Sequence, residues 1–256
     1  MLFTDSQLSH LHEQLVGGSA EVRSASIAVD CDPLAVGRAG GRLFSHSTYF
    51  KSPEGEEVAT LGVARRLTAS GSDRFASIEA QIAHLPSLVP GTRLTIGFSF
   101  NPNGPVSTEW DGFGSLDVIL PEVVVVRDRA GTRLVVAVPR GAGVASVLET
   151  LGGLSPWDAP PPPDPGVHTV ESLPSPTEWQ AEVAEAVGAI RGGALEKVVL
   201  ARSVQVQAER ATDPFDLAYH LAAENPSGYI YAVAVGDGAF VGASPELLLA
   251  QDGRRI

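Results

Sequence analysis

The chain has 256 residues and a mass of 26.7 kDa, with 44% apolar and 19% charged residues. This apolar share is sufficient for a large hydrophobic core and excludes disorder of the whole chain. Acidic residues outnumber basic ones 30 to 18, and the formal net charge of −12 disfavours nucleic acids and anionic membrane surfaces as partners. The single cysteine, Cys31, excludes an internal disulfide framework and any multi-cysteine metal site.

Residues 1–152 form the first predicted part of the chain and mix helices with strands. Apolar periodicity predicts helices over residues 5–16, 73–85 and 143–151, whereas the glycines of Gly37–Gly41 indicate a loop. Runs rich in β-branched residues predict strands over 22–30, 42–50, 56–68, 93–100, 116–127 and 132–138.

A proline-rich segment over residues 153–174 separates the first part from the last. Its prolines are Pro160, Pro161, Pro162, Pro163 and Pro165. Because proline removes a backbone donor and fixes φ, we expect an extended connector here rather than a helix or strand.

Residues 175–256 open with a strong helix signal. Ser175 and Glu178 form a capping box with Pro176 at the first helical position, and Gly192 ends the helix. A strand over 196–207 and a helix from Asp213 are expected next. Further strands are predicted over 228–235, 239–242 and 247–251. Helices and strands without regular alternation favour an α+β fold.

Two side chains in this last part are candidates for acid–base chemistry. Lys197 begins an apolar run, where it fits a strand-end lysine that reaches into solvent, or a desolvated amine that acts as a general base. Glu246 stands between a tight turn and an apolar run, where it fits a solvent-facing turn residue or a buried, protonated general acid. The two residues belong to different predicted strands and could face a common cleft.

The segments Leu195-Glu-Lys-Val-Val-Leu-Ala-Arg202 and Gly242-Ala-Ser-Pro-Glu246 resemble motifs of the chorismate-utilising enzymes, and most closely those of the isochorismate synthases. The resemblance runs from about residue 93 to the end and includes Gly97-Phe-Ser-Phe100. It implies a sandwich of antiparallel sheets flanked by helices, with chorismate as the substrate. The product, isochorismate, would serve either menaquinone or siderophore biosynthesis.

The resemblance also implies roles for both candidates. Lys197 matches the lysine that activates the water attacking C2 of chorismate, and Glu246 matches the acid that protonates the departing C4 hydroxyl. Ammonia-using relatives such as anthranilate synthase carry glutamine at the position of Lys197. Salicylate synthases share both residues and add a pyruvate elimination, so they are the alternative within the family.

The sequence departs from the family pattern after residue 251, where a hairpin turn at Gln251-Asp252-Gly253 is followed by only three residues. The family's Mg²⁺ ligands lie in segments that would follow residue 256. We therefore expect a fold that is incomplete at its C-terminus, inactive as residues 1–256 alone and prone to aggregate. A non-catalytic chorismate-binding module and a remnant without function are the other hypotheses.

No motif in the sequence indicates an oligomeric state. The chain shows neither a signal peptide pattern nor an apolar stretch of roughly 18 residues, so we expect a cytoplasmic location.

Overall fold

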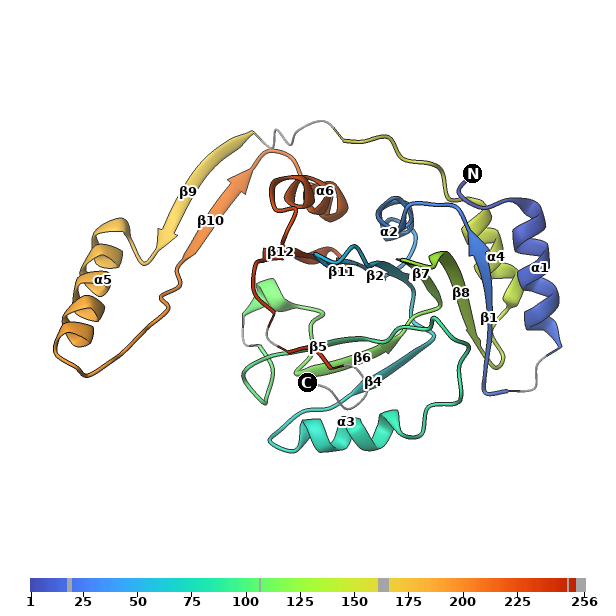
Figure 1. Ribbon diagram of the computed structural model, residues 1–256, viewed down its shortest axis with the longest axis horizontal. Helices are drawn as coiled ribbons and strands as arrows, with labels where there is room; N and C mark the ends of the chain where they lie inside the picture. The colour runs from blue at the N-terminus through green and yellow to red at the C-terminus, as the bar shows by residue number, and fades with distance from the viewer. Residues whose placement is uncertain (18–19, 106, 161–165, 248, 252–256) are drawn as a thin grey trace. The chain divides into compact units, whose positions relative to one another are not determined.

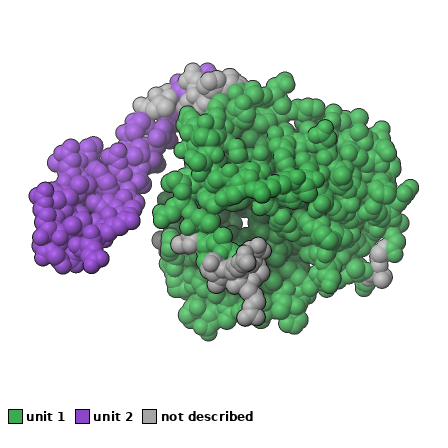
Figure 2. Space-filling model, viewed as in Figure 1, with its two compact units in different colours: residues 1–161, 213–256 green, residues 162–212 purple. Residues whose placement is uncertain are grey.

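The computed structural model describes residues 1–17, 20–105, 107–160, 166–247 and 249–251, without the side chains of residues 167 and 168. Most of the predicted proline run and of the predicted turn at 251–253 lies outside these residues. The chain forms two compact units, residues 1–161 with 213–256 and residues 162–212 (Figure 2). This grouping cuts across the linear division at residues 153 and 175, and the assignment of 175–256 to a catalytic portion stays a prediction.

The larger unit is built on an antiparallel sheet of seven strands, in the order β1-β8-β7-β3-β2-β11-β12 (Figure 1). The strands are β1 (Val22–Val29), β2 (His46–Lys51), β3 (Glu57–Leu61), β7 (Val123–Asp128), β8 (Gly131–Pro139), β11 (Tyr229–Val235) and β12 (Gly238–Ser244). Strand β11 pairs with β2 over its length, from Ile230 opposite Lys51 to Val235 opposite His46. The last part of the chain therefore extends a sheet that the first part begins.

A second antiparallel sheet has three strands in the order β4-β6-β5. Its strands are β4 (Arg65–Thr68), β5 (Thr95–Phe98) and β6 (Leu116–Leu120), and the short 3-10 helix η1 (Thr108–Trp110) lies between β5 and β6. The runs 56–68 and 116–127, each expected to be one strand, are two strands in different sheets. Gly62, with φ of +72°, makes the first crossing, and Pro121, which has no N–H for a ladder, lies at the second.

Helices flank the seven-stranded sheet on one face (Figure 1). They are α1 (Asp5–Val16), α2 (Pro33–Gly41), α4 (Val144–Gly152) and α6 (Pro214–Glu224). The largest apolar cluster joins α1, α2 and α4 to the sheet, while Phe215 of α6 packs with Tyr49 and Ile230. Helix α3 (Arg74–Ile82) packs on the three-stranded sheet through Ile78. The predicted α+β fold of antiparallel sheets flanked by helices is confirmed.

Helix α2 corrects the loop expected at Gly37–Gly41. Asp32 caps the helix by accepting a hydrogen bond from the Ala35 N–H, and Pro33 occupies its first turn. The glycines bring the helix close to its neighbours: a Cβ on Gly40 would lie 2.4 Å from Leu61, and one on Gly37 would lie 2.9 Å from Phe215. The glycines indicate close packing here rather than a break in the helix, a distinction that depends on tertiary contacts.

The smaller unit contains β9 (Val167–Leu173), α5 (Pro176–Arg191) and β10 (Ser203–Ala208). The predicted capping box of α5 is confirmed, since the Ser175 hydroxyl accepts the Glu178 N–H and the Glu178 carboxylate accepts the Ser175 N–H. Strand β9 contradicts the prediction that the connector contains no element. It pairs antiparallel with β10, a partner 30 or more residues further on that local sequence does not reveal.

Candidate active site

Lys197 lies in the smaller unit, between α5 and β10, in a segment without regular secondary structure. The strand predicted from residue 196 begins only at Ser203, which pairs with Leu173. Pro174, which follows Leu173 at the end of β9, has no N–H with which to continue the ladder of hydrogen bonds. Lys197 is exposed, and so is the apolar run that follows it: Val199 is 81% exposed.

The motif around Lys197 is connected to α5 by its last residue. The guanidinium of Arg202 lies 5.9 Å from the centre of the Trp179 ring, within range of a cation–π contact. Trp179 is in the first turns of α5, directly after the capping box. This contact anchors the C-terminal end of the Lys197 segment to the helix within the same unit.

Glu246 lies in the larger unit, two residues after the end of β12. Its N–H donates to the hydroxyl of Ser244 over 3.3 Å, and the same hydroxyl donates to the Glu246 carbonyl oxygen over 2.9 Å. The Glu246 side chain is exposed. The strand predicted over 247–251 is absent from the described residues 247 and 249–251, because no neighbouring strand pairs with them.

Aromatic side chains cover the face of β11 and β12 that is turned away from α6. The Tyr231 and Phe240 rings are 5.3 Å apart, and Phe240 is 5.3 Å from Trp110. Phe50 of β2 extends this face, with its ring 6.1 Å from Tyr229. Phe240 and Trp110 are about two-fifths exposed, so the strand that leads to Glu246 presents a partly open aromatic surface.

The two predicted catalytic residues therefore belong to different units, Lys197 to residues 162–212 and Glu246 to residues 213–256. Each is exposed within its own unit. A base and an acid on separate elements suit a reaction in which attack and departure take place on opposite faces of a ring, but both roles need a site that is shielded from bulk solvent.

Comparison with known proteins gives a family match over nearly the whole chain. A model of the family described as "Chorismate binding enzyme" matches residues 9–256. The chain belongs to the chorismate-binding enzymes. The predicted resemblance is thereby confirmed at the level of the family.

Curated members of the chorismate-binding enzymes resemble the chain over most of its length. The salicylate biosynthesis isochorismate synthase of Pseudomonas aeruginosa is 30% identical over 240 residues, which cover 88% of this chain and 50% of that protein. Isochorismate synthase MenF of Bacillus subtilis is 24% identical over 267 residues, covering 96% of this chain and 55% of that protein. The chain thus spans about half the length of these relatives.

The fold agrees with that of a solved chorismate-binding enzyme. The structure of MenF, the menaquinone-specific isochorismate synthase from Escherichia coli, superposes with a TM-score of 0.68 at 18% identity. The match covers 94% of this chain and 55% of the MenF chain. At this identity the likeness concerns the fold.

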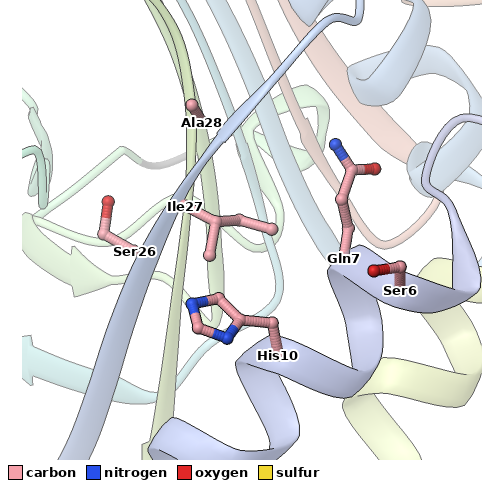
Figure 3. Close-up of a pocket in the computed structure, with 6 residues that line it drawn as sticks. All are labelled: Ser6, Gln7, His10, Ser26, Ile27 and Ala28. Carbon is pink, nitrogen blue, oxygen red and sulfur yellow. The ribbon is translucent and has the colours of Figure 1, made fainter.

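Two hollows lie on the surface of the larger unit. One of about 360 Å³ is formed by Ser6, Gln7 and His10 of α1 and by residues 26–28 of β1 (Figure 3). Another, of about 420 Å³, lies between the turn at residues 54–56 and the turn at residues 128–130. Neither contains a residue of the two family motifs.

No group of three His, Cys, Asp or Glu side chains that could hold a metal ion occurs in the described part of the chain. Likewise, none of the helices described here is both long and apolar enough to cross a membrane.

Sequence reasoning proposed Glu246 as a site residue but assigned no role to Ser244 or Tyr231. The contribution of Ser244 and Tyr231 depends on the pairing of β12 with β11 and on the turn that follows. The signals in the sequence were Ser244 itself, two residues before Glu246, and Gly242 at the start of the motif, whose spatial neighbour, Tyr231, lies on the adjacent strand.

Proposed function

We propose that the protein containing this chain is an isochorismate synthase, with Lys197 as the general base and Glu246 as the general acid. The observation that supports this most directly is the family match over residues 9–256, which includes both motifs. The activities of the relatives are consistent with it, since both proteins described above are named isochorismate synthases.

The proposed reaction is an isomerisation in which one water enters and one leaves. The neutral amine of Lys197 accepts a proton as the oxygen of water bonds to C2 of chorismate. The ring double bonds shift, the C4–oxygen bond breaks, and the departing hydroxyl takes a proton from Glu246. Both side chains must begin in their uncharged forms, which requires a desolvated site.

Neither side chain is desolvated within its own unit by the residues that the structure describes. We therefore expect residues 1–256 alone to be inactive, and the active protein to cover Lys197 and Glu246. Mg²⁺ would hold a substrate carboxylate, with ligands outside the described residues.

The test uses the protein at the length its cell makes, with chorismate as substrate and the product identified by chromatography. The chain contains two lysines, Lys51 and Lys197, so Lys51→Gln is a matched control for Lys197→Gln. Glu54→Gln, in the turn after β2, serves the same purpose for Glu246→Gln. General acid–base groups contribute about 10² to 10⁴ in rate, and we expect losses of this size for the two site variants only.

The product distinguishes the remaining hypotheses. Isochorismate supports the proposal, whereas salicylate with pyruvate would place the protein among the salicylate synthases. Saturable chorismate binding without turnover would indicate a binding module. A wild-type rate in Lys197→Gln would refute Lys197 as the base.

A further inference from the structure

The side chain of Ser244 makes two hydrogen bonds to the backbone of Glu246. Its Oγ accepts the Glu246 N–H over 3.3 Å and donates to the Glu246 carbonyl oxygen over 2.9 Å. The residue between them, Pro245, has a fixed φ and no N–H. One hydroxyl thus restrains both polar groups of the Glu246 backbone, in a turn that has little freedom of its own.

Ser244 is itself fixed by the larger sheet. It is the last residue of β12 and lies opposite Tyr229 of β11, at the end of a register that runs without a shift from Gly238. On the α6 side of the strand, Val241 and Ala243 pack against the apolar cluster of α6. The hydroxyl of Ser244 is therefore attached to a strand that is held by both pairing and packing.

The opposite face of β12 is held by an aromatic ring. Tyr231 crosses Gly242 so closely that a Cβ on Gly242 would lie 2.3 Å from the Tyr231 hydroxyl oxygen and 2.5 Å from Cζ. The Phe240 ring lies 5.3 Å from Tyr231 on the same face. The final residues of β12 thus have neighbours on both sides, and the restraint ends where Ser244 meets the exposed turn.

From these contacts we infer that Ser244 is a positioning residue for the acid of the reaction. It acts through the Glu246 backbone and directs the Glu246 carboxyl group toward the departing hydroxyl of the substrate. This inference rests on the proposed function, since it takes Glu246 as the acid. Loss of the two hydrogen bonds would free the Glu246 backbone from the end of β12 and allow the carboxyl group to shift. A displacement of about 1 Å in a reacting group can cost 10²-fold in rate.

The test compares Ser244→Ala with Ser244→Thr in the protein at its native length. Alanine removes both hydrogen bonds, and we expect kcat to fall by about tenfold to a hundredfold with KM changed by less than about twofold. Threonine retains the hydroxyl, and kcat should return to within about threefold of wild type. Ser52→Ala is the control, because the Ser52 hydroxyl also accepts a backbone N–H in a turn, that of Glu56 at 3.2 Å.

A double-mutant cycle separates positioning from a general structural role. If Ser244 acts through the Glu246 carboxyl group, Ser244→Ala should have no further effect on kcat beyond about twofold in a Glu246→Gln background. A multiplicative loss in that background would overturn the inference, as would a loss that threonine does not restore. A thermal unfolding midpoint unchanged from wild type should accompany the loss in Ser244→Ala.

The remaining outcomes separate this inference from the function on which it rests. Wild-type isochorismate formation with an unaffected Ser244→Ala variant would overturn the inference alone. A native protein that forms no isochorismate would overturn both.

Discussion

The two units of the chain differ sharply in what holds them together. In the larger unit, the seven-stranded sheet has apolar clusters on both faces, and side chains such as Val123, Leu134 and Ile230 are fully buried. In the smaller unit, no side chain that the structure describes is buried, and most apolar residues of α5 and all those of β10 are exposed.

The comparison shows that local sequence signals can specify a helix that has no buried face. Helix α5 has a complete capping box and sixteen residues, although it buries none of them. Strands β9 and β10 form a ribbon of two strands, an arrangement that is marginally stable in water by itself. The position of Glu246 is therefore set by a packed sheet, whereas the contact described for the Lys197 segment, between Arg202 and Trp179, lies within the small unit.

The largest expected difference between the units concerns apolar truncation. Phe215 is 1% exposed and packs against α2, so Phe215→Ala should lower the free energy of unfolding by about 3 to 5 kcal/mol. Val187→Ala, in α5, should change it by less than about 0.5 kcal/mol, because Val187 is 38% exposed. Urea titrations of both variants measure this, and equal effects would remove the distinction between the units.

The second effect is a pH dependence confined to the larger unit. His46 is 5% exposed, and burial, assisted by the charge of Arg66, lowers its pKa to about 4 from an ordinary value of 6.5. The unfolded chain therefore binds this proton more readily than the folded chain. The free energy of unfolding is therefore unaffected by His46 above about pH 7. It falls as the pH drops from 6.5 to 4, by up to about 3 kcal/mol, because protonation of His46 favours the unfolded chain.

Urea titrations between pH 7 and pH 4 would measure this loss. His46→Gln should flatten the pH dependence over that window, relative to its own stability at pH 7. His12→Gln, on the exposed side of α1, is the control and should retain the wild-type slope. A wild-type slope in His46→Gln would contradict the assignment.

The smallest effect uses the same local motif in both units. Thr4 with Gln7 caps α1, and Ser175 with Glu178 caps α5. Removing such a cap costs about 1 kcal/mol. Because α1 contributes Leu11 to the core, Thr4→Ala should lower the free energy of unfolding of the larger unit by about 1 kcal/mol. Ser175→Ala should leave this free energy of unfolding unchanged and speed amide hydrogen exchange in α5 alone. A lower free energy of unfolding in Ser175→Ala would show that α5 is coupled to the core.

The sequence predicted those features that depend on near neighbours. The capping box at Ser175 and the helix over residues 5–16 each consist of residues close together in the chain, and both are present. Strand β9 was missed because it depends on a distant partner, β10. Helix α2 was missed although Asp32 and Pro33 mark its start, because the glycines that pack it against Leu61 and Phe215 are also typical of a loop.

The candidate site divides in the same way. Lys197 and Glu246 were identified from contiguous motifs, and their roles as base and acid remain predictions. That Lys197 precedes its strand rather than lying in it could not be predicted, because the ladder's end is determined by Pro174 on the partner side. The link from Ser244 to Glu246 spans two residues, but its significance depends on β12 being held by β11.

The proposed reaction makes one demand that a single measurement can test. If water attacks C2 as the C4 hydroxyl leaves, isochorismate formed by the native-length protein in ¹⁸O-labelled water must carry one ¹⁸O atom, at the C2 hydroxyl. Mass spectrometry with fragmentation would locate it. We predict complete single incorporation in the wild-type protein, and a rate of labelled product formation that is about 10²- to 10⁴-fold lower in Lys197→Gln. Isochorismate without ¹⁸O, or labelled isochorismate formed at the wild-type rate in that variant, would contradict the account.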